Sequence, residues 1–289
     1  MRRIPESELI LNPDGSVFHL HLQPEQLADR VVMMGDPARV DMVASFFESR
    51  ECEVQNREFR TITGVFRGKR ITALSHGIGG DNIDIVVNEL DALVNIDLVL
   101  RTERAEKKSL SIVRIGTSGS LQPDIPLGAY LISARSVGFD GVLNFYAGRD
   151  GVCDLDFEKE LCEFIGWSSQ HAAPYVVSAH KGLLERLNRG DMIEGVTISA
   201  NGFYGPQGRR LRLPLDDDRL NEKIEAFRYG EEKITNYEME GAALAGLARL
   251  LGHRAVTVCD IIAGRTDLSA NVNYKGGMKE LVKLVLERI

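Results

Sequence analysis

Hydrophobic and polar positions follow two alternating patterns along the chain. Short runs rich in β-branched residues predict strands, and segments with apolar residues at helical spacing lie between them. The C-terminal segment shows the helical pattern most clearly, with apolar residues at Met278, Leu281, Val282, Val285 and Ile289. The predicted strands are Arg30–Met34, Arg70–Leu74, Ser111–Ile115, Ala129–Ser133, Gly195–Ser199 and Ala255–Asp260. The predicted helices are Ile83–Ile96, Lys181–Asn188, Glu238–Leu251 (closed by Gly252) and Met278–Ile289.

This alternation predicts an α/β fold. Helices that connect strands cover both faces of a sheet whose strands run mainly parallel. No internal repeat or long linker divides the chain, so we expect residues 1–289 to form a single domain with a mixed, mainly parallel central sheet flanked by helices. Two segments break the pattern. The charge-dense Leu100–Ser109 predicts a solvated loop, and the polar Leu211–Tyr229 predicts a flap over a pocket.

Composition narrows the class of protein. A hydrophobic content of 44% and a charged content of 27% are ordinary for a globular enzyme, and a net charge of -7 disfavours a general nucleic-acid surface. The start of the chain lacks the apolar core of a signal peptide, and no apolar run reaches the length of a membrane span. The four cysteines are scattered without metal-ligand spacing, so we expect no metal site and a cytoplasmic protein.

Three glycine-containing loops follow predicted strands. They are Met34–Arg39, Ser75–Asn82 and Gly116–Ser120. Loops at the carboxyl ends of parallel strands share one edge of the sheet, and glycine lets backbone N–H groups approach a bound anion closely. The Gly77–Gly80 string lacks the full spacing of a dinucleotide-binding motif, which disfavours a dehydrogenase. We therefore expect an anion site at this edge.

Arg114 lies inside an otherwise apolar predicted strand, shortly before Gly116 and Thr117. A buried guanidinium needs a partner because it stays charged. One interpretation is a buried salt bridge. The other, which we favour, is bidentate capture of phosphate, with Thr117 adding a hydroxyl group and Gly35 a backbone donor.

Two glutamates, Glu238 and Glu240, flank Met239 just before a run of small and aliphatic residues. An ionised carboxylate that leaves water needs donors, a cation or ligand hydroxyl groups. One interpretation is a pair of solvated glutamates beside a core helix. The other is a sugar site, in which a carboxylate binds vicinal hydroxyl groups and the methionine forms an apolar floor.

Several strings together resemble the nucleoside phosphorylase-I superfamily, and within it the uridine phosphorylases most of all. The resemblance runs from about Ser16 to Thr266. The motifs stand in the order of the family: Val17–Leu20, Gly35–Val40, Arg57–Phe59, Gly77–Gly80, Arg114–Gly119, Phe203–Arg209, Asn236–Glu240 and Arg265–Thr266.

The resemblance assigns residues to phosphate and to ribose. For phosphate it implies Gly35, Arg39, Arg114 and Thr117, together with Arg57 donated by a neighbouring subunit. For ribose it implies Met239 and Glu240, together with His19 of a neighbouring subunit and Phe18 packed beside that histidine. The family therefore implies a homodimer as the smallest complete unit, and it leaves a hexamer open.

The resemblance also assigns a pocket for the base. Phe203 would stack on uracil, and Gln207 and Arg209 would bind its polar edge. The implied neighbours of the base are Ser118, Gly119 and Ile262. A glutamine amide matches N3–H and O2 of uracil, and arginine can donate to O4. As the glycosidic bond breaks, the base gains negative charge, which a guanidinium stabilises more than the neutral ground state.

The implied activity is the reversible phosphorolysis of uridine, with deoxyuridine as a second candidate substrate, by a pentosyltransferase. Arg114, Gln207 and Arg209 would be its catalytic residues, inorganic phosphate its co-substrate, and no cofactor is implied. The alternatives are a purine nucleoside phosphorylase, a nucleosidase on the same scaffold, and a nucleoside-binding protein without activity. Purine enzymes of the family carry an acid near the base, and Asp260 lies a few residues upstream of that place.

The chain departs from the family pattern in three places. Gly205-Pro206 reverses the usual order in the base loop, and Val99–Ser109 is longer than in compact bacterial enzymes. In some relatives a monovalent cation lies at the dimer interface near positions that match Glu58, Ile78 and Asn82. Asn82 is itself a departure, which argues against that ion here.

Overall fold

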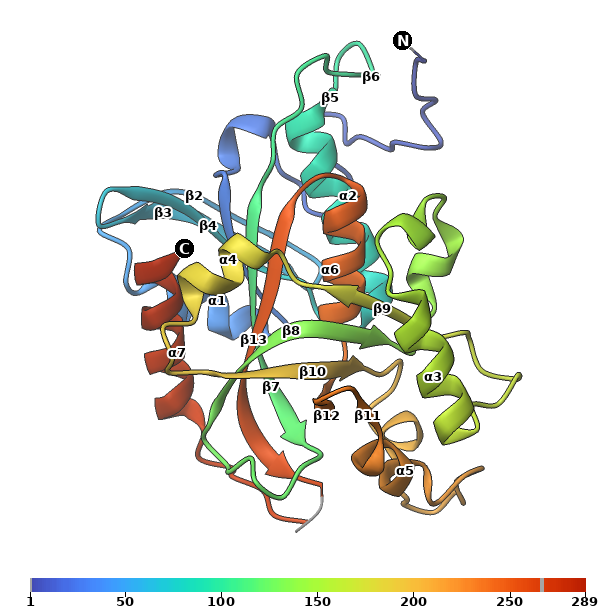
Figure 1. The fold of residues 1–289 in the computed structure, drawn as a ribbon. Helices are drawn as coiled ribbons and strands as arrows, with labels where there is room; N and C mark the ends of the chain where they lie inside the picture. The colour runs from blue at the N-terminus through green and yellow to red at the C-terminus, as the bar shows by residue number, and fades with distance from the viewer. Residues whose placement is uncertain (1, 266–267) are drawn as a thin grey trace.

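A mixed β-sheet forms the centre of the molecule, with helices on both of its faces (Figure 1). The structure is a computed structural model that describes residues 2–265 and 268–289. Its strands are β1 (Arg30–Met34), β2 (Ser49–Asn56), β3 (Phe59–Phe66), β4 (Lys69–Ser75), β5 (Ile96–Asp97), β6 (Thr102–Glu103), β7 (Ser111–Ser120), β8 (Tyr130–Gly138), β9 (Tyr175–Ser178), β10 (Ile193–Ser199), β11 (Arg228–Tyr229), β12 (Glu232–Glu238) and β13 (Arg254–Gly264). Its α-helices are α1 (Pro37–Ala44), α2 (Gly80–Asn95), α3 (Leu155–Ile165), α4 (Lys181–Leu187), α5 (Leu220–Ala226), α6 (Gly241–Leu250) and α7 (Lys275–Arg288).

Parallel pairing builds the middle of the sheet. It joins β4, β1, β7 and β13 in one run and β8, β10 and β12 in another. Antiparallel pairing adds β3 and β2 at one end, and it also joins β13 to β8 and β12 to β7. These last two contacts close β7, β13, β8, β10 and β12 into a ring of strands. The predicted fold class is confirmed.

Two apolar layers hold five of the helices on the sheet, and a third buried cluster, with Phe157 and Ile224, holds α3 and α5. On one face, α2 and α6 pack through residues such as Leu90 and Leu244. On the other face, α1, α4 and α7 pack through residues such as Val40, Leu183 and Leu281. All five side chains are at most 2% exposed, so each layer excludes water and fixes where the strands end.

Two predicted boundaries were wrong at the carboxyl ends of strands. Gly116–Ser120, predicted as a loop, continues β7, because β13 pairs alongside it as far as Gly264 and β12 pairs with Ser120. Glu238, predicted as the first residue of a helix, ends β12, and α6 begins at Gly241. The predicted strand Arg30–Met34 is confirmed, and Gly252 has the predicted left-handed backbone, with φ of 80°.

The two irregular segments contain more structure than predicted. Within Leu100–Ser109, Thr102–Glu103 forms β6, and Arg101 is only 8% exposed. Its guanidinium donates to the carbonyl groups of Ile4 and Leu9, so a charged residue is buried against the N-terminal segment. Leu211–Tyr229 contains α5 and β11, and only its first part is an exposed loop.

Across residues 2–265 and 268–289, none of the helices combines the length and the apolar character that crossing a bilayer requires. Over the same residues, no grouping of three or more His, Cys, Asp or Glu side chains is arranged to hold a metal ion.

Candidate active site

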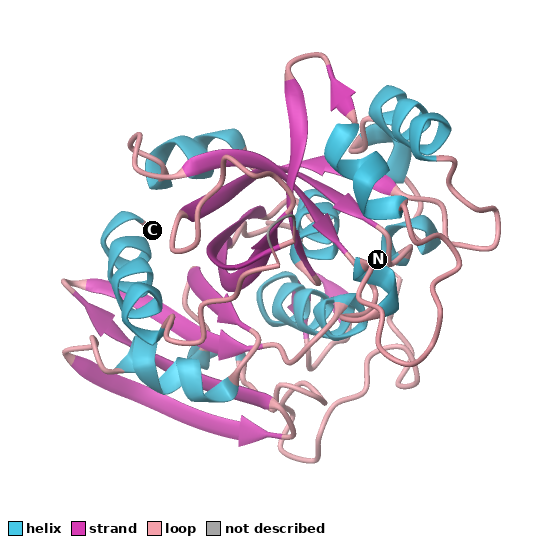
Figure 2. Cartoon of the chain, turned by 90° about the horizontal axis from the view of Figure 1, so that it is seen from below, coloured by secondary structure: helices cyan, strands magenta, loops and turns pink. Residues whose placement is uncertain are grey.

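A cavity of about 1140 Å³ opens where β1, β4, β7 and β13 end. Figure 2 looks onto the carboxyl ends of β7 and β13 from that side. The predicted site residues that line the cavity are Gly35, Arg39, Arg114, Thr117, Ser118, Gly119, Phe203, Gln207, Arg209, Met239, Glu240 and Ile262. His19 and Arg57 are the predicted residues that do not line it. The fold therefore brings together, at one edge of the sheet, residues that lie far apart in the sequence.

The loop after β1 turns sharply into α1. Asp36 caps the helix, because its carboxylate accepts a hydrogen bond of 2.9 Å from the backbone N–H of Ala38. Gly35 lies so close to the next loop that a Cβ atom there would be 3.0 Å from the carbonyl oxygen of Gly77. Arg39, in the first turn of α1, places its Nη2 atom 3.4 Å from the hydroxyl group of Tyr274. This turn contributes Gly35, Asp36 and Pro37 and the guanidinium-bearing Arg39 to the cavity lining.

Arg114 lies on the floor of the cavity and forms two buried ion pairs. Its Nη1 atom is 2.8 Å from a carboxylate oxygen of Glu238, and its Nη2 atom contacts Glu240. Burial disfavours the charged form of Arg114, but the two carboxylates outweigh this effect and raise its pKa. The salt-bridge interpretation of Arg114 is therefore correct, and Arg114 also lines the cavity.

Glu238 is held by the ends of two strands and the start of a helix. Its carboxylate accepts hydrogen bonds from the backbone N–H groups of Glu240 and Gly241, at 2.9 and 2.8 Å, and from the hydroxyl group of Ser199. It also pairs with Arg114. Because its acceptors are occupied by the protein, Glu238 fixes the start of α6 and the position of Arg114.

Glu240 has fewer partners within the protein. Its carboxylate accepts one backbone hydrogen bond, 2.7 Å long, from Gly79, and it contacts Arg114. Gly79 has φ of 99°, which favours glycine and turns this N–H group towards the carboxylate. Burial raises the pKa of Glu240 against the opposing effect of Arg114. The second glycine loop thus donates to a carboxylate of the chain, and the solvated interpretation of the two glutamates is wrong.

The residues predicted to bind the base line the same cavity and contact one another. Gln207 is 3% exposed, whereas Phe203 is 50% exposed. The Arg209 guanidinium lies 3.8 Å above the centre of the Phe203 ring and donates to the Gln207 side chain and, at 2.7 Å, to the carbonyl group of Phe203. Gln207 is therefore buried in this wall of the cavity, next to the guanidinium with which it was predicted to act.

Arg265 is a residue of this wall to which the sequence assigned no role. Its guanidinium donates to the carbonyl group of Gln207 at 3.0 Å, and it lines the cavity beside Arg209. Burial and the charge of Arg265 lower the pKa of Arg209 to about 10. The sequence did contain a signal for Arg265, because Arg265–Thr266 is one of the family motifs. Thr266 itself lies outside the described residues.

Tyr274 lines the same cavity from the start of α7, and neither its spacing nor its neighbours in the sequence indicated this position. It joins the site only because α7 folds back against α1.

Asp260 is not among the residues that line the cavity. Its side chain is 2% exposed and points towards the first turn of α7, where one carboxylate oxygen is 3.1 Å from the position of a Cβ atom on Gly277. The residues that line the cavity at this end of β13 are Ile262, Ala263 and Gly264. An apolar side chain therefore stands in the wall of the base pocket.

His19 and Arg57 form a separate cluster with Phe18. The Arg57 guanidinium lies 5.7 Å from the centre of the Phe18 ring, and the Nδ1 atom of His19 is 2.6 Å from a carboxylate oxygen of Glu89. The side chain of Asn56 also donates to the carbonyl group of His19 at 2.8 Å. In one chain this cluster is not part of the cavity lining.

The positions named for an interface cation lie at the mouth of the cavity. The side chain of Asn82 donates to a Glu58 carboxylate oxygen at 3.3 Å, and Ile78 is 71% exposed. A cation at this place would need the carboxylate of Glu58, and Asn82 already donates to one of its two oxygens.

Comparisons with known proteins extend these observations. A family model described as "Phosphorylase superfamily" matches residues 29–285. A uridine phosphorylase of Treponema pallidum is 33% identical over 249 residues, covering 86% of this chain and 83% of that protein. A uridine phosphorylase of Haemophilus influenzae is 30% identical over 254 residues, covering 87% and 88%. The crystal structure of a Trypanosoma brucei nucleoside phosphorylase, described as showing uridine phosphorylase activity, is 26% identical with a TM-score of 0.88 and covers 97% of this chain and 98% of that one.

Proposed function

The chain belongs to the phosphorylase superfamily, and from this membership we propose that it is a pentosyltransferase that catalyses the reversible phosphorolysis of uridine to uracil and ribose 1-phosphate. One observation carries the choice of base: Phe203, Gln207 and Arg209 contact one another in the lining of the cavity that Glu240 also lines. The uridine phosphorylases among its relatives, at 33% and 30% identity, support the same substrate.

Phosphate would bind between Gly35, Arg39, Arg114 and Thr117, which line one side of the cavity. In the free chain the Arg114 guanidinium is engaged by Glu238 and Glu240. We infer that Glu238 keeps its contact when substrates bind, since its other acceptors are occupied by the backbone. Glu240 would turn its carboxylate to the ribose hydroxyl groups, and the freed guanidinium nitrogen of Arg114 would bind phosphate.

The reaction then needs positioning and electrostatic stabilisation rather than a covalent enzyme intermediate. A phosphate oxygen forms a bond to C1′ while the bond from C1′ to N1 of uracil breaks, and the electron pair of that bond stays with the base. Gln207 and Arg209 would stabilise the negative charge on uracil until N1 takes a proton. Arg209 stays protonated at neutral pH, because its pKa is lowered only to about 10. Inorganic phosphate is the co-substrate, and the proposal needs no further cofactor.

The decisive experiment is an assay of uracil release from uridine, with and without phosphate. Phosphorolysis predicts release only with phosphate, and ribose 1-phosphate as the second product. Release without phosphate would identify a nucleosidase, and uridine binding without release would identify a binding protein. Deoxyuridine and thymidine measured beside uridine would define the preferred sugar and base.

Inosine in the same assay tests the purine alternative. A purine enzyme would favour inosine over uridine. The structure disfavours this outcome because Asp260 points towards α7, whereas Ile262 lines the cavity.

We also propose that two chains form the smallest active unit, in which His19 and Arg57 of one chain complete the cavity of the other. Both residues lie outside the cavity of their own chain. Arg57→Ala and Arg114→Ala should each abolish activity, whereas a mixture should regain about a quarter of it, because random pairing restores one intact site in half of the dimers. A mixture that stays inactive after dissociation and reassembly would contradict this arrangement.

A cytoplasmic location fits this proposal, because Cys52, Cys153, Cys162 and Cys259 are all free thiols.

A further inference from the structure

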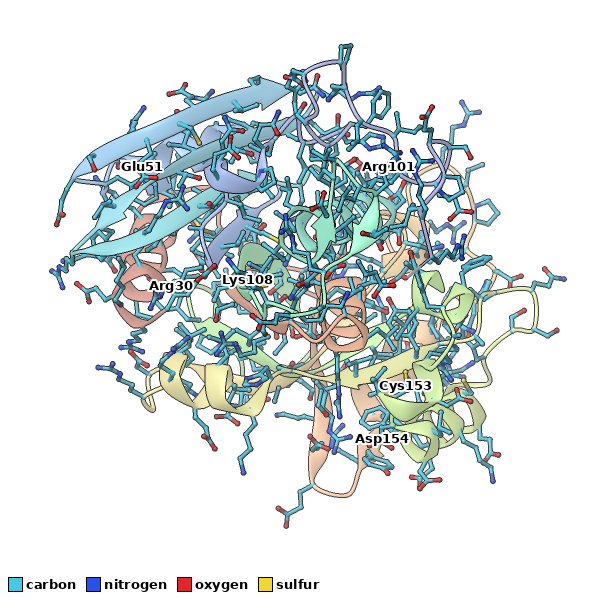
Figure 3. The ribbon with its side chains drawn as sticks, turned by 90° about the horizontal axis from the view of Figure 1, so that it is seen from above. Arg30, Glu51, Arg101, Lys108, Cys153 and Asp154 are labelled. Carbon is cyan, nitrogen blue, oxygen red and sulfur yellow. The ribbon has the colours of Figure 1, made fainter. Side chains whose placement is uncertain are left out.

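A group of arginines lies at the amino-terminal edge of the sheet, opposite the cavity. Arg30 begins β1 and Arg254 begins β13, and both pair with Ser111 at the start of β7, one from each side. Neighbouring strands are about 4.8 Å apart, so the Cα atoms of the two arginines are about 10 Å apart. Figure 3 looks onto this edge from above and labels Arg30.

The two arginines point to the same face of the sheet. Laterally paired residues share a face, and side chains alternate along each strand. The residues two positions further on, Val32 and Val256, pack in the apolar layer under α4 and α7. Arg30 and Arg254 therefore extend on the side of the sheet that carries α4.

Helix α4 adds a third guanidinium. Leu183 and Leu187 pack into the same apolar layer, and Arg186 lies beside them on α4. Burial first, and then the charges of Arg254 and Arg30, lower the pKa of Arg186. These three side chains thus face one another closely enough for their charges to interact.

No carboxylate of the described part of the chain forms an ion pair with Arg30, Arg186 or Arg254. Three acids of α4, of the segment after it and of α7 are engaged elsewhere: Glu185 pairs with Lys181, Asp191 with Arg288 and Glu287 with Arg67. The Nε atom of Arg254 is buried without a hydrogen-bond partner. Three guanidinium groups therefore converge without a protein counter-ion, in a chain whose net charge is -7.

We propose that Arg30, Arg186 and Arg254 form a second anion site, which binds a multiply charged phosphate-bearing anion. Guanidinium groups bind phosphate oxygens in pairs, and three of them suit an anion with several charges better than one phosphate. The site is separate from the cavity, because Thr117 is six residues further along β7 than Ser111, which corresponds to about 20 Å.

Titration calorimetry at low ionic strength tests the site with two probes, inorganic tripolyphosphate and a nucleoside triphosphate. We expect the Arg186→Gln/Arg254→Gln double variant to bind tripolyphosphate at least tenfold more weakly than the wild type, with unchanged phosphorolysis. Arg39→Gln, which alters the cavity, should keep this binding. Tighter binding of the nucleoside triphosphate would identify a nucleotide as the ligand, and equal binding an inorganic polyphosphate.

Two results would overturn the proposal: wild-type protein that binds neither probe, and binding that Arg39→Gln abolishes but the double variant keeps.

A second measurement does not depend on the choice of probe. Like charges without counter-ions repel, so Arg186→Gln should raise the melting temperature at low salt and have less effect at high salt. Arg219→Gln is the matched control, because Arg219 is paired with Glu222 on the surface. A melting temperature lowered by Arg186→Gln would show that this arginine has a partner in the protein, and would also refute the site.

Discussion

The substitution Glu240→Gln tests the proposed division of labour between the two glutamates. Glutamine keeps the shape of the side chain and can still accept the hydrogen bond from the N–H group of Gly79. It removes the negative charge that contacts Arg114 and that, in our proposal, binds the ribose hydroxyl groups. The change therefore separates the charge of Glu240 from its place in the fold.

The expected loss follows from the kind of interaction removed. A hydrogen bond to a charged group contributes about 1.5–3 kcal/mol, so kcat/KM for uridine should fall about 10- to 150-fold. The effect on folding should be small, because a neutral side chain also avoids the cost of burying the Glu240 carboxylate, which is 5% exposed. The assay is the phosphate-dependent conversion of uridine to uracil, beside thermal unfolding of the same samples.

Glu238→Gln is the matched control. Its carboxylate accepts hydrogen bonds from two backbone N–H groups and from Ser199, so this change should lower the melting temperature as well as the activity. A Glu240→Gln enzyme with wild-type kcat/KM would refute the ribose role. A Glu240→Gln enzyme that unfolds as readily as Glu238→Gln would show that both glutamates are structural.

Three further predictions concern two other residues of the cavity wall and the buried Asp260, which lies outside the cavity lining. Arg209→Ala should remove about 2–4 kcal/mol of transition-state stabilisation and so lower kcat/KM for uridine, measured as uracil release. Arg212→Ala, which changes an exposed neighbour, should have no effect. Equal activity of the two variants would contradict the role of Arg209 in binding the base. Tyr274→Phe removes the hydroxyl group 3.4 Å from Arg39. It should raise the KM for phosphate about two- to fivefold in steady-state kinetics and leave the KM for uridine unchanged. A change in the KM for uridine alone would contradict this prediction. Burial raises the pKa of Asp260 from 3.8 to about 6, so the folded protein holds a proton that the unfolded chain releases, and stability falls as the pH rises from about 4 to 6. Asp260→Asn should therefore raise the free energy of unfolding by about 1–3 kcal/mol at pH 7.5 and leave it unchanged below pH 4. Denaturant titrations at both pH values test this prediction. A variant that is less stable than the wild type at pH 7.5 would contradict it.

The sequence predicted the fold class because apolar strands and amphipathic helices alternate clearly. It did not predict β2, whose residues are largely polar and half or fully exposed, since this edge strand is defined by its pairing with β3. Arg101 was wrongly predicted to lie in a solvated loop, for a related reason. Its acceptors are the carbonyl groups of Ile4 and Leu9, more than 90 residues away, and a local run of charges carries no information about such partners.

Most of the predicted site residues do line one cavity, because family motifs mark strand ends that the parallel sheet brings to one edge. The partners of those residues were harder to predict. Gly79 donates to Glu240, which is 161 residues further along the chain, and only the three-dimensional path of α2 and α6 reveals this contact. Pattern reasoning therefore predicted residues that share one cavity, but it did not predict which of their charges are paired with one another.

The two ion pairs of Arg114 imply that uridine and phosphate strengthen each other's binding. Arg114 meets two carboxylates in the free chain, so an incoming phosphate dianion must displace one of them or bind beside both negative charges. Glu238 cannot leave without exposing the N–H groups at the start of α6, whereas Glu240 can exchange Arg114 for hydroxyl groups of a sugar. Uridine that engages Glu240 should therefore strengthen phosphate binding, and phosphate should strengthen uridine binding by the same factor. Phosphate affinity measured with and without a non-reactive uridine analogue would test this coupling, and equal affinities would show that Arg114 binds phosphate without releasing Glu240.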